Sequence, residues 1–425
     1  MFQLRNLALA AGLLSATAFG QSQPLNLQPG DIIIADTLTQ FPNQGEGAVR
    51  ILRADGSVDT VLSGSPLYSL GGIFLDRDGA ILASSFEYDS SHENGIYRLA
   101  PDGGAVLPLN ADVLIDQFDV VRDSRGDLIV ADGYAGLTRI HPDGSVERYS
   151  PNTGDIIAMG VELDFDGQIL LSSPPALGNR TTPGNISKVD ADGNRTILPV
   201  DPLVLNAPNG LSLAPDGSFI ATNFAQYLSD KDPRLVHVDR NGTTTALAEG
   251  GLLQKPKGVH INERGQILVA DTDEQAVMTY GPVVGMQHVL WDLADGLDDG
   301  DPVDRPFAVT QVPVLWLRTE YEAIAGTTSE VRVSSASKYW GQNIVLAVSR
   351  QHAATPMNFL WPSSPRISHL DLSNPQLVFG RLPANGADWT FSGPIPGALA
   401  GSALHLQVFL PSDALLSNYI ALPVL

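Results

Sequence analysis

The stretch Ala207-Pro-Asn-Gly-Leu-Ser-Leu-Ala-Pro-Asp-Gly-Ser-Phe-Ile-Ala-Thr-Asn223 predicts two short strands joined by a tight Pro-Asp-Gly turn. The pattern occurs six times, and an apolar run follows each turn glycine. The turn glycines are 49, 47, 41, 50 and 48 residues apart, at Gly30, Gly79, Gly126, Gly167, Gly217 and Gly265. Repeats of about 40 to 50 residues built from short strands are typical of a β-propeller.

Each repeat contains enough strand-like segments for a four-stranded blade. Asp-Gly or Asn-Gly turns such as Asp143-Gly144 predict the hairpin between the third and fourth strands. The inner strands are expected near residues 72–75, 119–121, 160–163, 210–213, 258–261 and 307–311. The chain enters on a second strand and leaves the repeats on an inner strand. We therefore expect residues 307–311 to pair antiparallel with residues 31–36 and close a ring of six blades.

The repeat and the acidic charge both end near Val312. The whole chain has a net charge of −22, and the residues from 313 onward contribute nothing to it, because six acidic side chains balance six basic ones. Strand-like runs continue there without the period and predict a small β-sandwich. The expected fold class is all-β, a six-bladed β-propeller followed by a sandwich. The expected divisions are a signal peptide (1–20), the propeller (21–313) and a C-terminal domain (314–425).

The first twenty residues have the features of a secretory signal peptide. Arg5 supplies the positive charge, residues 7–19 are apolar or small, and Ala18-Phe19-Gly20 fits a cleavage site. An uncleaved membrane anchor is the alternative, although the run is short for a span. We expect a secreted, periplasmic or cell-surface protein. The absence of cysteine favours a bacterial source. The acidic balance argues against nucleic acid and anionic membranes as partners, and no later stretch has transmembrane length.

The repeat motifs resemble those of a known group of propellers. Residues 208–217 (Pro-Asn-Gly-Leu-Ser-Leu-Ala-Pro-Asp-Gly) and 266–272 (Gln-Ile-Leu-Val-Ala-Asp-Thr) look like NHL repeats. They also resemble the senescence-marker-protein (SMP-30)/gluconolactonase family, over roughly residues 30–312. Residues 404–410 and 416–419 resemble a C-terminal domain of secreted planctomycete-like bacterial proteins. The first resemblance implies a ring-shaped fold but is weak for chemistry, because such propellers host many functions.

Aligning the repeats on the turn glycines places one residue of each blade beside the ring centre. These residues are Gly71, Phe118, Met159, Asn209, Lys257 and Phe307. The gluconolactonase-like family holds a divalent metal at this level, and its Asn ligand matches Asn209. Its Asp falls on Lys257 and its Glu on Gly71, so two acidic ligands are missing. A lysine ammonium would repel a cation. We therefore expect no metal cofactor, with a divalent cation such as calcium as the alternative.

Two of these residues leave alternatives open. Asn209 is expected to cap a turn with its amide, but it could instead contact a ligand or a metal ion. Lys257 is expected to keep its ammonium in the water of the channel. The alternative is a desolvated lysine with a lowered pKa, suited to acid–base chemistry or anion binding. The five candidate ligand-binding residues are therefore Asn209, Lys257, Phe118, Met159 and Phe307.

A second ring of polar residues follows the six turn glycines. It consists of Asp36, Ser85, Asp132, Ser173, Asn223 and Asp271, each six residues after its glycine. A side chain that recurs in every repeat serves what all repeats share, so we expect this ring to cap backbone N–H groups. Aromatic residues in two of the loops that follow, 86–88 and 224–227, are candidates to line a site at the ring centre.

The sequence supports two main functional hypotheses. The first is a non-catalytic module whose ring face binds a small molecule, a glycan or a protein. It rests on an intact scaffold with an incomplete metal set, and on the absence of any nucleophile elbow or phosphate-binding loop. The second is a metal-dependent, lactonase-like hydrolase that acts at the ring centre through Asn209 and a divalent ion. A purely structural surface module remains a third possibility.

Overall fold

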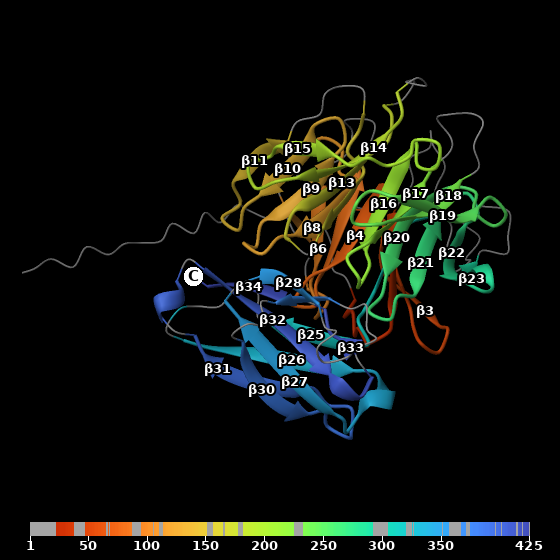
Figure 1. Ribbon diagram of the computed structural model, residues 1–425. Helices are drawn as coiled ribbons and strands as arrows, with labels where there is room; N and C mark the ends of the chain where they lie inside the picture. Colours follow the sequence, from red (N-terminus) through yellow and green to blue (C-terminus); the bar gives the residue numbers. More distant parts are fainter. Residues whose placement is uncertain are drawn as a thin grey trace, which may run out of the picture.

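The computed structural model describes residues 23–424 with several gaps. The gaps are residues 38–46, 65–66, 68, 87–94, 105, 110–113, 151–155, 165, 177–181, 225–232, 292–304, 320–324, 326, 351, 357–366, 371–374, 396, 401, 414 and 419. The proposed signal peptide therefore lies outside the described residues. The rest of the chain forms two bodies of β-structure, one of which is a ring of four-stranded sheets (Figure 1).

Six antiparallel sheets of four strands form the ring, as predicted. From the inner strand outward, the first blade contains β24 (Pro306–Gln311), β1 (Ile32–Thr37), β2 (Gly47–Leu52) and β3 (Val58–Ser63), and the second contains β4 (Ser69–Leu75), β5 (Ile81–Phe86), β6 (Gly95–Leu99) and β7 (Leu107–Leu109). The third contains β8 (Asp119–Arg122), β9 (Leu128–Asp132), β10 (Gly136–Ile140) and β11 (Val146–Ser150), and the fourth contains β12 (Gly160–Leu163), β13 (Ile169–Ser173), β14 (Asn185–Val189) and β15 (Arg195–Ile197). The fifth contains β16 (Pro208–Leu213), β17 (Phe219–Asn223), β18 (Arg234–Val238) and β19 (Thr244–Glu249), and the sixth contains β20 (Pro256–Ile261), β21 (Ile267–Asp271), β22 (Ala276–Gly281) and β23 (Gly285–Trp291).

The two ends of the repeat region close the ring within one blade. Strand β24 pairs antiparallel with β1, from Ile32 opposite Gln311 to Asp36 opposite Pro306. This confirms the closure predicted from the offset phase of the repeats. The turn glycines also have the positive φ that the turns require, from +74° at Gly167 to +100° at Gly30. The spacing of the turn glycines in the sequence thus corresponds to one four-stranded blade of the ring.

The Asp and Asn residues of the polar ring on the second strands cap backbone N–H groups. Asp132 Oδ1 accepts from the N–H groups of Ile115 and Asp116 at 2.9 and 2.8 Å. Asn223 Oδ1 accepts from those of Asn206 and Ala207 at 2.9 and 2.8 Å. The capped segments are the ones that lead into the inner strand of the same blade. Asp271 accepts from the N–H groups of Gln254 and Lys255, and Asp36 accepts from that of Arg305. The capping role is confirmed for these four residues, and each cap fixes where its inner strand begins, whereas Ser173 Oγ accepts from the Arg195 side chain at 3.0 Å.

The C-terminal body is a β-sandwich. One sheet has the order β25 (Leu315–Thr319), β26 (Thr328–Ser335), β31 (Trp389–Pro394), and the other has the order β30 (Gln376–Arg381), β27 (Asn343–Ser349), β32 (Ser402–Leu410), β33 (Leu415–Leu416), with β34 (Ile420–Val424) also on β32. Strands β28 (His352–Pro356) and β29 (Ile367–Leu370) form a separate hairpin. Short 3-10 turns lie at Ser337–Tyr339, Gly397–Leu399 and Pro411–Asp413.

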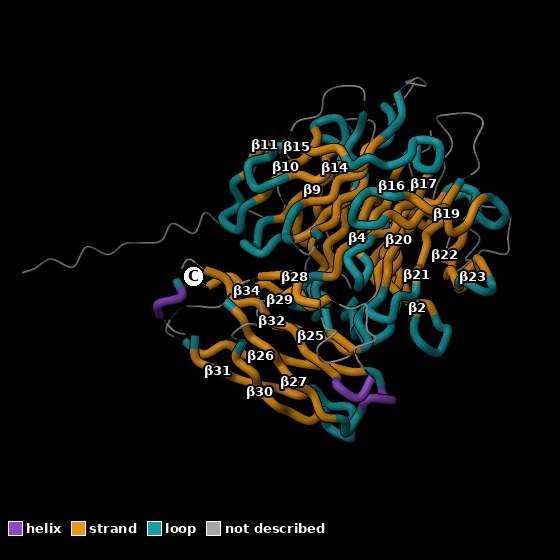
Figure 2. Tube along the Cα trace, viewed as in Figure 1, coloured by secondary structure: helices purple, strands orange, loops and turns teal. Residues whose placement is uncertain are grey.

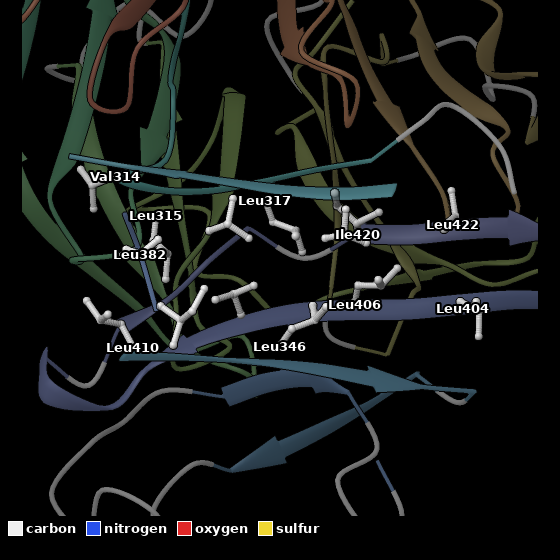
Figure 3. Packing of buried hydrophobic residues seen from close by; sticks show 14 of the residues in the cluster. Val314, Leu315, Leu317, Leu346, Leu382, Leu404, Leu406, Leu410, Ile420 and Leu422 are labelled. Carbon is white, nitrogen blue, oxygen red and sulfur yellow. The ribbon is translucent and has the colours of Figure 1, made fainter. Parts of the chain in front are cut away.

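A single apolar cluster fills the space between the two sheets of the sandwich. Figure 3 shows side chains from opposing strands pointing toward one another, among them Leu317, Leu346 and Leu406. All three are buried, as alternation along half-buried strands requires. The tube view in Figure 2 shows that strands dominate both bodies, and within the described residues the short helical segments lie in the sandwich. The predicted fold class, a propeller followed by a sandwich, is confirmed.

The sandwich packs against the end of the propeller where the inner strands finish. Trp316 of β25 is buried in the apolar cluster of the first two blades. The backbone N–H of Val314 donates to the Glu263 carboxylate. Arg264 donates to the Tyr339 hydroxyl at 2.7 Å. The side chains on both sides of the junction therefore hold the sandwich over one mouth of the central channel.

Candidate functional site at the ring centre

The inner strands come close together just below the predicted ring. A Cβ placed on Gly160 would lie 2.3 Å from the Asn209 carbonyl oxygen, and one on Gly210 would lie 2.4 Å from that of Lys257. Only glycine permits this approach. Thr222 Oγ1 accepts from the Gly210 N–H at 2.8 Å and donates to the Lys257 carbonyl at 2.7 Å. The backbone that carries Asn209 and Lys257 is thereby held in place.

All five predicted ligand-binding residues line one cavity of about 230 Å³ in the channel. Asn209, Lys257 and Phe307 are the second residues of β16, β20 and β24, whereas Phe118 and Met159 directly precede β8 and β12. Gly71, the sixth aligned position, lines the same cavity. The alignment on the turn glycines therefore brought together residues that are neighbours in space.

Lys257 is desolvated, contrary to the expectation that its ammonium lies in channel water. The residue is only 7% exposed. Its Nζ lies 4.0 Å from the ring centroid of Phe224 and 5.0 Å from that of Phe307. Burial lowers the pKa of Lys257 to about 7, and the positive charge of Lys255 adds to this effect. The expectation failed because Phe224 covers the lysine from a position outside the aligned ring.

Asn209 also differs from its expected role. The residue is 4% exposed, and its Nδ2 atom is buried without a hydrogen-bond partner in the described part of the chain. It caps no turn there, so the capping expectation is wrong. Asn209 and Lys257 occupy adjacent blades, where they present an amide nitrogen and an amine beside the same cavity. Both groups are hydrogen-bond donors.

Aromatic and apolar side chains surround these donors on the other blades. Phe86, Phe118, Ile157 and Met159 form one buried cluster, with Phe307 packed against it. The ring centroids of Phe86 and Phe118 are 4.8 Å apart, and those of Phe86 and Phe307 are 5.5 Å apart. Phe86 and Phe224 begin the two aromatic loops singled out in the sequence, but only their fold positions show which ring meets Lys257.

Further along the channel, three titratable side chains lie in the wall, and the sequence did not single them out. Burial raises the pKa of Asp119 to about 7, although its carboxylate accepts from the N–H groups of Val161 and Val120. Burial also raises the pKa of Glu162 to about 7 and lowers that of His260 to about 4. The carboxylate of Asp119 bridges one inner strand to the next, which gives this residue a structural role.

The sandwich contributes to the far end of the channel. Trp316 and Asn418 line the 230 Å³ cavity, and an adjoining chamber of about 610 Å³ lies between propeller and sandwich. Asn418 is itself fixed, because its amide accepts from the Leu317 N–H at 2.7 Å and donates to the Leu317 carbonyl at 2.9 Å. The sequence had assigned the recessed centre to the propeller alone, and this contribution could not be read from the repeats.

Within the described ranges, no three His, Asp or Glu side chains come together in a way that could hold a metal ion. The described helices also include none that is long and apolar enough to cross a membrane.

Comparisons with known proteins find structural similarity at low sequence identity. A streptogramin B lyase is 13% identical with a TM-score of 0.43, over 65% of this chain and 88% of the other. A gluconolactonase from Xanthomonas campestris is 13% identical with a TM-score of 0.44, over 75% and 95%. PorZ, a surface component of the type-IX secretion system of Porphyromonas gingivalis, is 9% identical with a TM-score of 0.42, over 94% and 58%. No family model and no curated protein matches the chain. These similarities leave the function of the chain open.

Proposed function

We propose that the protein is a ligand-binding β-propeller whose site is the channel cavity around Asn209 and Lys257. The ligand is a small organic molecule with a carboxylate or carbonyl oxygen and an apolar body. The observation that carries this proposal is the pairing of two donors on one cavity. The Asn209 amide nitrogen is buried without a hydrogen-bond partner, and the amine of the buried residue Lys257 has no hydrogen-bond acceptor among the described residues. Buried donors without acceptors are costly, and a bound oxygen would satisfy them.

The walls of the cavity specify the rest of the ligand. Phe118, Met159 and Phe307 offer apolar and aromatic surface, which suits a small ring or chain. A positive ligand would meet the Lys257 ammonium and is disfavoured. The signal peptide proposed for residues 1–20 would place this binding outside the cytoplasm, in the periplasm or at the cell surface.

Benzoate is a direct probe of the proposed site, with benzylamine as its cationic counterpart. Calorimetry on the chain from residue 21 should detect benzoate but not benzylamine. Lys257→Met and Asn209→Leu should each weaken benzoate binding by roughly tenfold or more, because each removes one donor. Lys338→Met, on the exposed face of the sandwich, is the matched control and should leave binding unchanged. Equal binding by all variants would contradict the proposal.

The lactonase-like hydrolase is the competing function, and it requires a divalent ion at this level of the channel. Lys257 and Gly71 stand where that family's acidic ligands would be, so we expect no tight stoichiometric binding of Ca²⁺, Zn²⁺ or Mn²⁺ there. Calorimetry with each ion tests this. Micromolar or tighter binding that disappears in Asn209→Ala would overturn the binding-module proposal in favour of the hydrolase.

A further inference from the structure

We infer that the Lys257 amine forms a reversible imine with a small aldehyde or ketone held in the channel cavity. This inference rests on the proposed ligand site and narrows its ligand class from oxygen-bearing molecules to carbonyl compounds. It makes Lys257 a covalent anchor as well as a hydrogen-bond donor.

The surroundings of Lys257 leave its amine available for reaction. No hydrogen bond or ion pair joins its Nζ to any other residue that the structure describes, and its contacts are the faces of Phe224 and Phe307. Two other lysines are held by carboxylates, Lys188 by Asp164 at 2.7 Å and Lys255 by Asp273 at 3.5 Å. An amine becomes nucleophilic when it is desolvated in an apolar site and beside another cation.

The charges around Lys257 also favour the neutral amine. Burial acts most strongly on its pKa, and the cations of Lys255 and Arg305 lower it further, whereas Asp271 and Asp273 oppose them. Asp119 and Glu162 line the same channel, and burial keeps them partly protonated near neutral pH. With a pKa of about 7 instead of 10.5, Lys257 has roughly a thousandfold more neutral amine at pH 7 than an ordinary lysine.

The reaction needs no group beyond the protein and the carbonyl compound. The neutral amine attacks the carbonyl carbon, a C–N bond forms, and the carbonyl oxygen becomes a hydroxyl by taking a proton from the nitrogen. The C–O bond of this hydroxyl then breaks, and the hydroxyl leaves as water with the second proton of the nitrogen. The C=N bond forms at the same carbon. Asn209 Nδ2 has no partner and belongs to a residue of the same cavity wall, and in this inference it donates to the carbonyl oxygen during attack. The aromatic walls exclude water and so slow the reverse hydrolysis.

Borohydride trapping on the full mature chain tests the inference. The probe is benzaldehyde, and benzyl alcohol is its matched analogue without a carbonyl. Peptide mapping should place the reduced adduct on Lys257, at least about tenfold above Lys188, Lys255 and Lys338 at pH 7. Trapping should increase between pH 6 and pH 8, and the alcohol should compete without being trapped.

Variants separate failure of the imine from failure of the site. Lys257→Arg keeps a hydrogen-bond donor for the oxygen of the probe but cannot form an imine, so it should bind the alcohol and lose trapping. Preferential trapping at Lys257 in the unmodified chain supports the inference whether or not the variant folds. If the alcohol binds at Asn209 and Lys257 but labelling is uniform over the lysines, the imine inference is wrong and the binding site stands. If neither probe binds, the proposed function itself fails.

Discussion

Lys257 carries a buried positive charge that no carboxylate of the described chain neutralises directly. Cation–π contact with Phe224 and Phe307 offsets part of the desolvation. The remainder is a cost to folding that depends on pH. In the unfolded chain the lysine has its ordinary pKa of 10.5, whereas in the folded protein its pKa is about 7.

The first prediction concerns Lys257→Met, which removes the charge and preserves an unbranched side chain. Below pH 7 the lysine is protonated in both states, so the full cost of burying the charge is present. Between pH 7 and 10.5 the folded state binds fewer protons than the unfolded state, and stability increases with pH. The variant should therefore be more stable by up to about 3–5 kcal/mol at pH 6, with a smaller gain toward pH 10.

Thermal melts of Lys257→Met and the parent chain at pH 6 and pH 9.5 measure this difference. The comparison is made within each pH because the raised pKa values of Asp119 and Glu162 also make stability depend on pH. These two carboxyl groups lower the stability of both proteins as the pH rises from about 4 to 7. Lys338→Met should show little change at either pH. An equal effect of Lys257→Met at the two pH values would show that the lysine is not desolvated.

The second prediction concerns the cap at Asp132. Asp132→Ala removes the acceptor of two backbone N–H groups and of the Thr138 hydroxyl, which lies at 3.0 Å. The loss should destabilise the protein by roughly 2–4 kcal/mol in urea unfolding. Asp132→Asn keeps an acceptor oxygen and should cost much less, because Asn223 performs the same role in another blade. Equal costs for the two variants would contradict the capping role.

At the scale of elements, ring closure depends on a pairing between the first and last strands of the propeller. Strand β1 lies between β24 and β2 and so satisfies the backbone groups of both neighbours. Its residues Ile33 and Ala35 are also part of an apolar cluster that reaches into the second blade. Removing β1 would therefore expose two strand edges and open this cluster.

The third prediction is that deletion of residues 24–36 yields an insoluble product. A chain that begins at residue 21 is the matched control and should remain soluble and monomeric. Soluble yield and size-exclusion chromatography make the comparison. A soluble monomer with an unchanged far-ultraviolet circular dichroism spectrum would show that another segment can complete the blade.

At the scale of the whole molecule, the two bodies are more closely joined than the change in charge near Val312 suggested. Trp316 lies beyond the boundary expected at residue 313 but is buried among propeller side chains. Its ring also lies 3.4 Å from the position of a Cβ on Gly79, next to a turn of the second blade. The sandwich thus supplies a side chain to the propeller core as well as the floor of the channel.

The fourth prediction is that residues 21–313 and 314–425 each fold when expressed alone, and that the isolated propeller is less stable than the propeller in the whole chain. Without Trp316, the propeller piece should melt below the propeller transition of the whole chain. Trp316→Ala in the full chain should reproduce that loss, about 3–5 kcal/mol, because it leaves a cavity in the same cluster. Thermal melts of the two pieces and the variant provide the test, and an unfolded propeller piece would show that the domains are inseparable.

Much of the site could be predicted because equivalent positions in the repeats can be found by counting from the turn glycines. Counting from the turn glycines placed Asn209, Lys257 and Phe307 at one level, and the structure puts all three on one cavity. The same counting predicted the caps at Asp132 and Asn223. It did not predict that Phe224 covers Lys257, because that ring follows a second strand and reaches the centre only through the geometry of the blade.

The sequence by itself determined the number of blades, the pairing that closes the ring and the residues that face its centre. The number of blades and the residues that face the centre follow from a local period, since each turn glycine acts within its own repeat. The closing pair follows from the phase of that period at the two ends of the repeat region, where β1 meets β24. Tertiary structure alone decided that Lys257 is desolvated, that Asn209 lacks an acceptor and that Trp316 and Asn418 close the far end of the channel. Burial and charge state depend on side chains from several blades and from the sandwich, and no local pattern specifies which of them come into contact.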